Sequence, residues 1–214
     1  MKTLQRDDIV GVILAGGLSR RMGGGDKALA DLGGATMIDR VVACVAPQVG
    51  ALVLNANGDP VRFAALGLPV VADTVAGFVG PLAGVLAGMR WARANAPTAT
   101  HLLSASADAP FIPADLVSTL AAALAASRGR IALARSAGGL HPVIGLWPVD
   151  LADDLEAALS AGTRKVLAWT DRHGTVPVDF PMRTANGESI DPFFNANTPA
   201  ELDEAQRLLE LMGP

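Results

Sequence analysis

The sequence predicts an α/β fold: a doubly wound, mostly parallel sheet with helices on both faces. Short runs rich in Val, Ile and Leu alternate with longer stretches of helical pattern, and strands buried on both faces have such continuous apolar runs. Repeated strand–helix–strand units favour parallel strands joined by right-handed crossovers. The 214 residues are half hydrophobic and only 18% charged, so the chain can bury a large core.

The first half of the chain alternates regularly. Strands are expected at Ile9–Leu14, Ala51–Leu54, Pro69–Ala72 and His101–Ala105. Helical segments are expected at Met37–Ala46, Val61–Leu66, Pro81–Ala94 and Pro113–Ala126. Pro113 suits a first helical turn because the N–H that proline lacks has no partner there in any case.

The second half is less regular. Strands are expected at Arg130–Ala134 and Val143–Trp147, which could pair, and at Val176–Phe180. Helices are expected at Leu151–Leu159, Arg164–Asp171 and Pro199–Leu211. Thr198 is a good N-cap for the last helix, with Pro199 in its first turn and Glu201 three residues after the cap. No internal repeat or linker divides the chain, so we expect a single domain over residues 1–214.

Composition excludes several classes of protein. The net charge of −4 and the lack of a Lys/Arg run disfavour nucleic acid and membrane surfaces as partners. The apolar run 9–15 is too short for a membrane span or a signal peptide, and we expect a cytoplasmic protein. Cys44 is the only cysteine, which excludes an intramolecular disulfide and a zinc site built from cysteines.

Small or polar residues follow each of the first four predicted strands. They are Ala15-Gly16-Gly17, Asn55, Asp73 and Asp108. Open α/β sheets bind ligands beyond the carboxyl ends of their strands. The sequence therefore places the candidate site at this edge of the sheet.

A glycine-rich loop, Leu14-Ala15-Gly16-Gly17-Leu18-Ser19-Arg20-Arg21-Met22-Gly23-Gly24-Gly25-Asp26-Lys27, follows the first strand. Glycines let successive backbone N–H groups approach phosphate oxygens, and the cationic side chains offset phosphate charge. We therefore expect a triphosphate here. The loop is not a P-loop, because Asp26 precedes Lys27 and Ala28 follows it. Residues 23–28 match the dinucleotide fingerprint, but they begin well after the strand ends, and no acid follows the second strand.

The ordered motifs resemble the molybdenum cofactor guanylyltransferase (MobA-like) family, whose NTP-transferase fold is shared with sugar-nucleotide pyrophosphorylases. The loop is similar to that family's signature, and the likeness covers most of the chain. Its further motifs are Asn55-Ala56-Asn57, Asp73, Gly80-Pro81-Leu82-Ala83-Gly84, Asp108-Ala109-Pro110, His141-Pro142 and Asn195-Ala196-Asn197-Thr198-Pro199.

The resemblance implies transfer of GMP from GTP to molybdopterin-bound molybdenum with release of pyrophosphate. It implies Mg²⁺ as cofactor, with Asp108 as the metal ligand and with Lys27, Arg21 and Asp108 as the catalytic residues. The nucleotide would be bound by Leu14, Ala15, Gly16, Gly17, Lys27, Asn55, Asp73 and Asp108. Molybdoenzymes or other proteins of cofactor biosynthesis are implied as partners.

The acceptor is expected in the C-terminal half and the nucleotide in the N-terminal half. Candidate acceptor residues are Arg164, Lys165, Asn195 and Asn197, and His141 is a further candidate for an acceptor phosphate. Ordinary structural roles compete with these: surface charge for Arg164 and Lys165, and turn or cap formation for Asn195 and Asn197. No Ser/His/Asp set indicates a covalent intermediate.

Other functions remain open. The same chemistry could serve a cytidylyltransferase of the molybdenum cofactor or a sugar-phosphate nucleotidyltransferase; Gly17, in Ala-Gly-Gly rather than Ala-Ala-Gly, favours guanine by likeness to the family. A non-catalytic module that binds nucleotide or cofactor is the rival from another class. The presence of Lys27 and Asp108 argues against it, because binding alone does not require a metal carboxylate.

Overall fold

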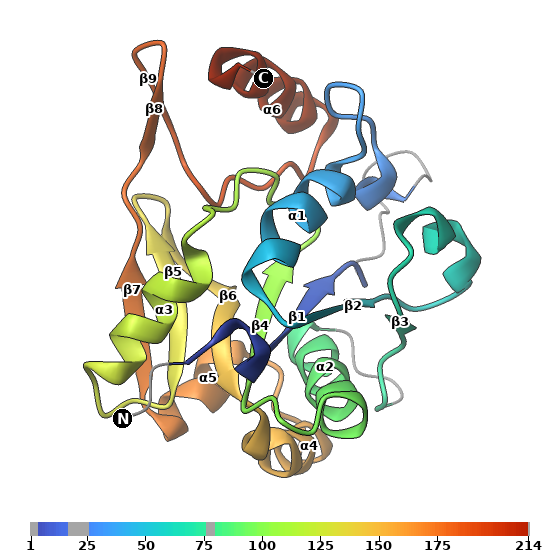
Figure 1. Ribbon diagram of the computed structural model, residues 1–214, viewed down its shortest axis with the longest axis vertical. Helices are drawn as coiled ribbons and strands as arrows, with labels where there is room; N and C mark the ends of the chain where they lie inside the picture. The colour runs from blue at the N-terminus through green and yellow to red at the C-terminus, as the bar shows by residue number, and fades with distance from the viewer. Residues whose placement is uncertain (1–3, 17–25, 76–79, 214) are drawn as a thin grey trace.

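The computed structural model describes residues 4–16, 26–75 and 80–213. A seven-stranded mixed sheet forms the centre of the fold (Figure 1). The strand order is β3-β2-β1-β4-β6-β5-β7. The strands are β1 (Ile9–Leu14), β2 (Ala51–Asn55), β3 (Val70–Val71), β4 (His101–Ser106), β5 (Ile131–Ser136), β6 (Gly139–Pro148) and β7 (Thr175–Asp179). Only β6 runs against its neighbours β4 and β5; the other pairings are parallel. This confirms the predicted α/β class with a mostly parallel sheet.

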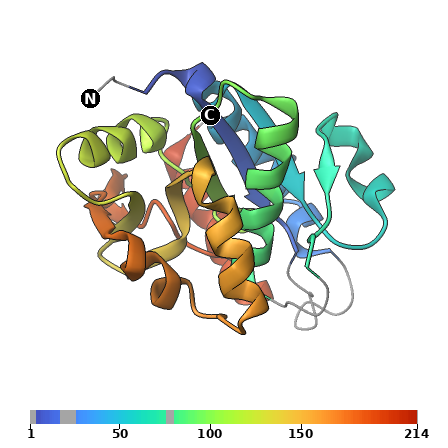
Figure 2. The same cartoon turned by 90° about the horizontal axis from the view of Figure 1, so that it is seen from below.

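Helices cover both faces of the sheet (Figure 2). They are α1 (Met37–Val45), α2 (Pro81–Asn95), α3 (Leu116–Ala125), α4 (Ala152–Ser160), α5 (Val166–Thr170) and α6 (Pro199–Met212). The helices α1 and α3 pack on one face and α2, α4 and α5 on the other. No helix in the described ranges has the length and apolarity needed to cross a membrane.

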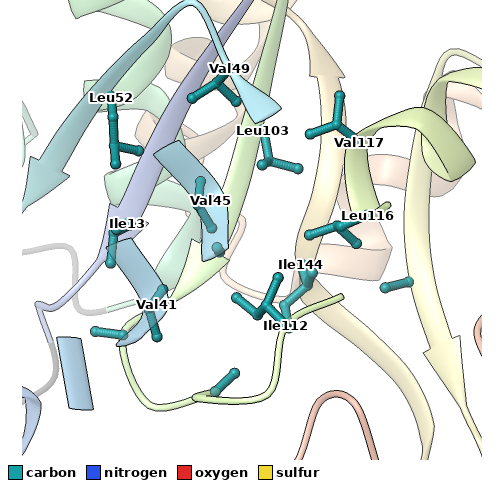
Figure 3. Packing of buried hydrophobic residues seen from close by; sticks show 14 of the residues in the cluster. Ile13, Val41, Val45, Val49, Leu52, Leu103, Ile112, Leu116, Val117 and Ile144 are labelled. Atoms are coloured by element: carbon teal, nitrogen blue, oxygen red, sulfur yellow. The ribbon is translucent and has the colours of Figure 1, made fainter. Parts of the chain in front are cut away.

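The alternation of side chains along each strand supplies both cores. In β1, Ile9 and Ile13 join the core under α1 and α3, while Val10 and Val12 face α2. Figure 3 shows the first of these cores, where Ile13 lies among side chains from the neighbouring strands and helices. Full burial of an aliphatic side chain is worth about 1.5–3 kcal/mol, so these layers fix the strand ends that carry the site.

A tight hairpin explains why β6 is antiparallel. Only two residues separate Ser136, which ends β5, from Gly139, which begins β6, and so short a connection can join only antiparallel strands. Gly139 has φ 113°, a value that L side chains rarely adopt. The hairpin brings the end of β5 and the start of β6 to the edge where β1 and β4 end.

Several predicted boundaries were wrong. The segment near Val61–Leu66 is a 3₁₀ helix over Pro60–Leu66, and the third strand has only two residues. Helix α3 begins at Leu116, so Pro113 lies before it and its carbonyl accepts from the Leu116 N–H. The helix expected from Arg164 begins at Val166, and a second small sheet, β8 (Arg183–Ala185) with β9 (Glu188–Ile190), was not expected. Figure 1 shows this hairpin and α6 at the end of the molecule toward which β4 points.

Candidate active site

The centre of the site is a contact among Lys27, Asp108 and Asn197. The ammonium Nζ of Lys27 donates to Oδ2 of Asp108 at 2.6 Å and to Oδ1 of Asn197 at 2.7 Å. The three residues come from the end of the glycine-rich loop, the turn after β4 and the segment before α6. The fold thus brings together three predicted site residues from distant parts of the chain.

Local structure holds each of the three in place. The hydroxyl of Ser106, the last residue of β4, donates to Oδ1 of Asp108. Lys27 begins a short 3₁₀ helix, Lys27–Leu29, that Asp26 caps by accepting from the Ala28 N–H at 3.2 Å. The carboxylate of Asp26 is in turn paired with Arg62 at 3.0 Å.

Asn197 is held by the start of α6. Glu201 accepts from the Asn197 N–H at 2.7 Å, and Thr198 caps the helix by accepting from the Glu201 N–H. One residue earlier, the Ala196 N–H donates to the carbonyl oxygen of Asp108 at 3.1 Å. The N-cap role expected for this segment is therefore present at Thr198, and it leaves the Asn197 side chain directed at Lys27.

The chemistry of this contact favours cations. Lys27 and Asp108 retain 15% and 24% of their side-chain exposure, so their ion pair is shielded but still reachable from solvent. Carboxylate and amide oxygens are also the hard ligands that Mg²⁺ prefers, and Mg²⁺ commonly uses one or two of them together with substrate phosphates. Within residues 4–16, 26–75 and 80–213, no cluster of three His, Cys, Asp or Glu side chains could hold a metal without such help.

A second polar group lies at the ends of β2 and β3. Asn55, only 3% exposed, donates through Nδ2 to Oδ1 of Asp73 at 3.0 Å and to the carbonyl of Val71 at 3.2 Å. Asn57 donates to Oδ2 of Asp73 at 2.8 Å and accepts from the Asp73 N–H at 3.0 Å. The amide of Asn55 has both protons engaged, so Asn55 can offer a ligand only its carbonyl oxygen, beside the carboxylate of Asp73.

Two glycines line this second group. A Cβ atom added to Gly84, on α2, would overlap Oδ1 of Asn55 and lie 2.7 Å from Cδ2 of Leu14. A Cβ at Gly16 would lie 3.6 Å from the same Asn55 oxygen. The backbone at Gly84 therefore approaches Asn55 so closely that any side chain there would displace Asn55.

Other predicted residues take no part in the contacts above, or fall outside the described residues. Gly17 and Arg21 fall outside the described residues. Arg164 and Lys165 precede α5, both exposed, and the Arg164 guanidinium turns back to the carbonyls of Leu159 and Thr163 at 3.2 and 3.0 Å. Oδ1 of Asn195 is buried and has no hydrogen-bond partner among the described residues.

A third polar group, Ser136, His141 and Asp191, lies at the same edge of the sheet. The Ser136 Oγ is 2.7 Å from both Nε2 of His141 and Oδ2 of Asp191. The residue types are those of a hydrolase triad, but the hydrogen bonds connect them in another order: the carboxylate contacts the serine, whereas in a triad it contacts the histidine. The group therefore does not activate Ser136 as a nucleophile.

Sequence reasoning missed Ser106, Asn57, Ser136 and Asp191 as members of these groups. Ser106 stands two residues before a predicted metal ligand, and Asn57 lies inside a quoted motif, so their positions carried a signal. Ser136 and Asp191 are 55 residues apart and meet only because β5 and the segment after β9 converge. No local sequence pattern predicts that contact.

Comparison with known proteins shows a family and close relatives for most of the chain. Residues 11–176 match the model of the MobA-like NTP transferase domain. Two proteins named molybdenum cofactor guanylyltransferase are similar: one from a Bradyrhizobium species, 52% identical over 94% of this chain and 92% of its own, and one from Mesorhizobium japonicum, 49% identical over 97% and 99%.

Solved structures share the fold. The molybdopterin-guanine dinucleotide biosynthesis protein A of Archaeoglobus fulgidus has a TM-score of 0.69 at 23% identity, covering 94% of this chain and 98% of its own. A CMP:2-keto-3-deoxy-manno-octonic acid synthetase complexed with CTP has a TM-score of 0.68 at 15% identity, covering 94% and 98%.

Proposed function

Because the chain belongs to the MobA-like NTP transferase family, we propose that it transfers GMP from GTP to molybdopterin-bound molybdenum and releases pyrophosphate. The product is the guanine dinucleotide form of the molybdenum cofactor. Identity near 50% with molybdenum cofactor guanylyltransferases over nearly the whole chain supports this activity. We place the reaction in the cytoplasm, where GTP is available, and propose molybdoenzymes or other proteins of cofactor biosynthesis as recipients of the product.

One structural observation carries the proposal: Lys27 is held between Asp108 and Asn197 at the edge of the sheet that binds ligands. Transfer of a nucleotidyl group needs little covalent help from the protein, because positioning and charge neutralisation supply most of the acceleration. A cation between two oxygen ligands, at the end of a glycine-rich loop, meets that need. The in-line attack on the α-phosphorus comes from the terminal phosphate of the acceptor.

The donor set fits Mg²⁺. Asp108 would hold the ion through its carboxylate and Asn197 through its amide oxygen, with phosphate oxygens and waters as the remaining ligands. Bound there, the ion would offset the negative charge that develops on the reacting phosphates. Ser106 keeps the second oxygen of Asp108 engaged and so fixes the direction in which the first one points.

Lys27 and Arg21 are the proposed phosphate contacts. With a divalent ion at Asp108 to supply neutralising charge, the Lys27 ammonium would contact the β- and γ-phosphates and the departing pyrophosphate. The backbone of Leu14 to Gly17 would approach the base and the phosphates, as the family likeness implies.

The group formed by Asn55 and Asp73 supports a preference for guanine. It offers a ligand only acceptors, namely the Asn55 carbonyl oxygen and the Asp73 carboxylate. Guanine presents two adjacent donors, N1–H and the N2 amino group, whereas adenine and cytosine present a single amino group. A site that leaves acceptors unpaired with the wrong base rejects that base strongly.

Each half of the chain is proposed to bind one of the two substrates. We propose that residues before α3 bind GTP and that the C-terminal half, with Asn195, Asn197, Arg164 and Lys165, binds the molybdopterin. Mixing GTP, Mg²⁺ and Mo-molybdopterin with the protein tests the whole proposal. One pyrophosphate should appear for each guanine dinucleotide formed; GTP binding without any pyrophosphate would show a binding module instead of an enzyme.

A further inference from the structure

We propose that Ser136 and Asp191 fix the tautomer of His141, and that His141 thereby presents Nδ1 as an acceptor for an N–H group of the pterin ring. The inference rests on the proposed function, and it assigns to three residues a role in recognising the second substrate. It replaces the expectation that His141 receives an acceptor phosphate.

Proton counting at Ser136 fixes the direction of each hydrogen bond. Its Oγ contacts Oδ2 of Asp191 and Nε2 of His141, both at 2.7 Å, and accepts from the Gly138 N–H at 3.3 Å. A carboxylate can only accept, so the single hydroxyl proton goes to Asp191. The remaining lone pair of Oγ must then accept a proton from His141, and Nε2 carries that proton.

The consequence is a defined acceptor at the other ring nitrogen. A neutral imidazole protonated at Nε2 has a lone pair at Nδ1. Burial, the largest effect, lowers the pKa of His141, which keeps the ring neutral near pH 7 despite the opposing field of Asp191. Nδ1 has no hydrogen-bond partner within the described part of the chain.

Packing holds the ring in this orientation. Phe193 packs against the imidazole with ring centroids 4.9 Å apart, and Phe180 meets Phe193 edge-on at 5.1 Å. Asp191 is also fixed, because its Oδ1 accepts from the Phe193 N–H at 2.8 Å. Gly138 leaves room for the carboxylate: a Cβ there would lie 2.8 Å from Oδ2 of Asp191.

The same segment connects this group to the proposed reaction centre. The chain turns back on itself between Asp191 and Phe194, whose N–H donates to the Asp191 carbonyl at 3.1 Å. It then passes through Asn195, with its buried and unpartnered Oδ1, to Ala196 and Asn197, which contact Asp108 and Lys27. Six residues span at most about 20 Å when extended, so this turned segment keeps His141 within reach of one substrate molecule.

The lone pair at Nδ1 selects the chemistry of the ligand group. A phosphate near neutral pH carries negative charge and offers mostly acceptors, so a neutral His141 would not attract it through Nδ1. The pterin ring offers an amino group and a ring N–H, both donors. His141 is therefore suited to orient the ring and leave the phosphate of the acceptor to the cationic centre.

The isosteric change Asp191→Asn should reverse the direction of the hydrogen bonds that join Asp191, Ser136 and His141. The amide oxygen must remain at the Phe193 N–H, so the amide nitrogen faces Ser136 and donates to it. The hydroxyl then donates to Nε2 of His141, and the proton of the ring moves to Nδ1. Nitrogen NMR of histidine-labelled protein should show the Nε2–H tautomer for His141 in the unaltered chain and the Nδ1–H tautomer in the variant.

Binding of molybdopterin, measured by fluorescence, is the second readout. Asp191→Asn and His141→Phe should each weaken it about tenfold, the effect of one well-made hydrogen bond, with GTP affinity unchanged. Asp179→Asn, at an exposed carboxylate paired with Arg135, is the matched control and should change neither the tautomer nor the binding.

The outcomes separate this inference from the proposed function. An unchanged tautomer in Asp191→Asn, or unchanged molybdopterin binding in both variants, overturns the inference even if GMP is transferred normally. Weaker binding together with the tautomer switch supports it, even if the unaltered protein binds molybdopterin and transfers no GMP.

Discussion

The ammonium nitrogen of Lys27 lies 2.6 Å from Oδ2 of Asp108, although 81 positions separate the two residues. The contact forms because β1 and β4 are parallel neighbours whose carboxyl ends coincide: Leu14 pairs with Ser106. The loop that leaves β1 and the turn that leaves β4 therefore start side by side. Two residues predicted to act on the same triphosphate already share one ion pair.

Asp108→Asn is expected to abolish turnover and leave the fold intact. The amide keeps the shape of the side chain but removes the anionic metal ligand, so kcat at saturating Mg²⁺ should fall by a factor on the order of 10²–10³. Asp115→Asn, just before α3, is the control and should retain full activity with the same circular dichroism spectrum. Wild-type kcat for Asp108→Asn at limiting Mg²⁺ would refute the metal assignment.

Lys27→Ala is expected to weaken GTP binding about tenfold or more and to leave GMP nearly unaffected. In the proposed site the lysine would contact the β- and γ-phosphates, which the monophosphate lacks, and such charge-assisted hydrogen bonds are the strong ones. Titration calorimetry with both ligands measures the difference. Lys165→Ala should change neither affinity, and an equal loss for GTP and GMP in Lys27→Ala would place Lys27 away from the outer phosphates.

Gly84→Ala should reduce both stability and nucleotide affinity. Its methyl group would displace Asn55 and press on Leu14, and such overpacking costs about 1–3 kcal/mol. The matched control is Gly88→Ala, one turn along α2, whose methyl group would lie 3.0 Å from Val12 and away from Asn55.

Gly84→Ala should lower the free energy of unfolding in urea more than Gly88→Ala does, because its methyl group meets the tighter contacts. Only Gly84→Ala should raise the Kd for GTP, by about tenfold if one base contact is lost. Equal GTP affinity in the two folded variants would remove Asn55 from the nucleotide site.

Stability should decrease as the solution becomes acidic, in part through His101. Burial lowers the pKa of this residue, and the nearby Asp150 and Asp8 offset that only partly. A histidine whose folded pKa lies below its unfolded value of about 6.5 favours the native state above that value, and this contribution is lost as the pH falls through the two pKa values.

His101→Gln should therefore reduce the difference in free energy of unfolding between pH 7.5 and pH 5.5. Some difference should remain, because burial also lowers the pKa of His141. Urea unfolding at both pH values is the measurement. If the free energy of unfolding changes equally between the two pH values in the variant and in the unaltered chain, His101 does not contribute to the pH dependence.

The sequence predicted the fold class and the places of the first four strands because both depend on local patterns. Ile9–Leu14 is the observed β1, Asn55 is the last residue of β2, and Asp73 and Asp108 follow β3 and β4 as expected. The reversal of β6 was not predicted, because a two-residue hairpin depends on the left-handed backbone of Gly139 and not on hydrophobic period. The β8–β9 hairpin was missed because its strands have three residues each and little burial.

Pairing between distant residues was the part that local patterns could not supply. Lys27, Asp108 and Asn197 were each predicted, but their shared contact depends on how the segment before α6 meets the turn after β4. The group of Ser136, His141 and Asp191 depends on a turn after β9 that no motif marks.

The identity of the transferred nucleotide tests the central claim most directly. The protein is incubated with Mg²⁺, Mo-molybdopterin and an equimolar mixture of α-labelled GTP, CTP and ATP, and the nucleotide joined to the cofactor is then identified. GMP should be incorporated in excess over CMP and AMP by at least about tenfold, roughly 1.4 kcal/mol in transition-state binding. Equal or greater incorporation of CMP would contradict the guanylyl assignment.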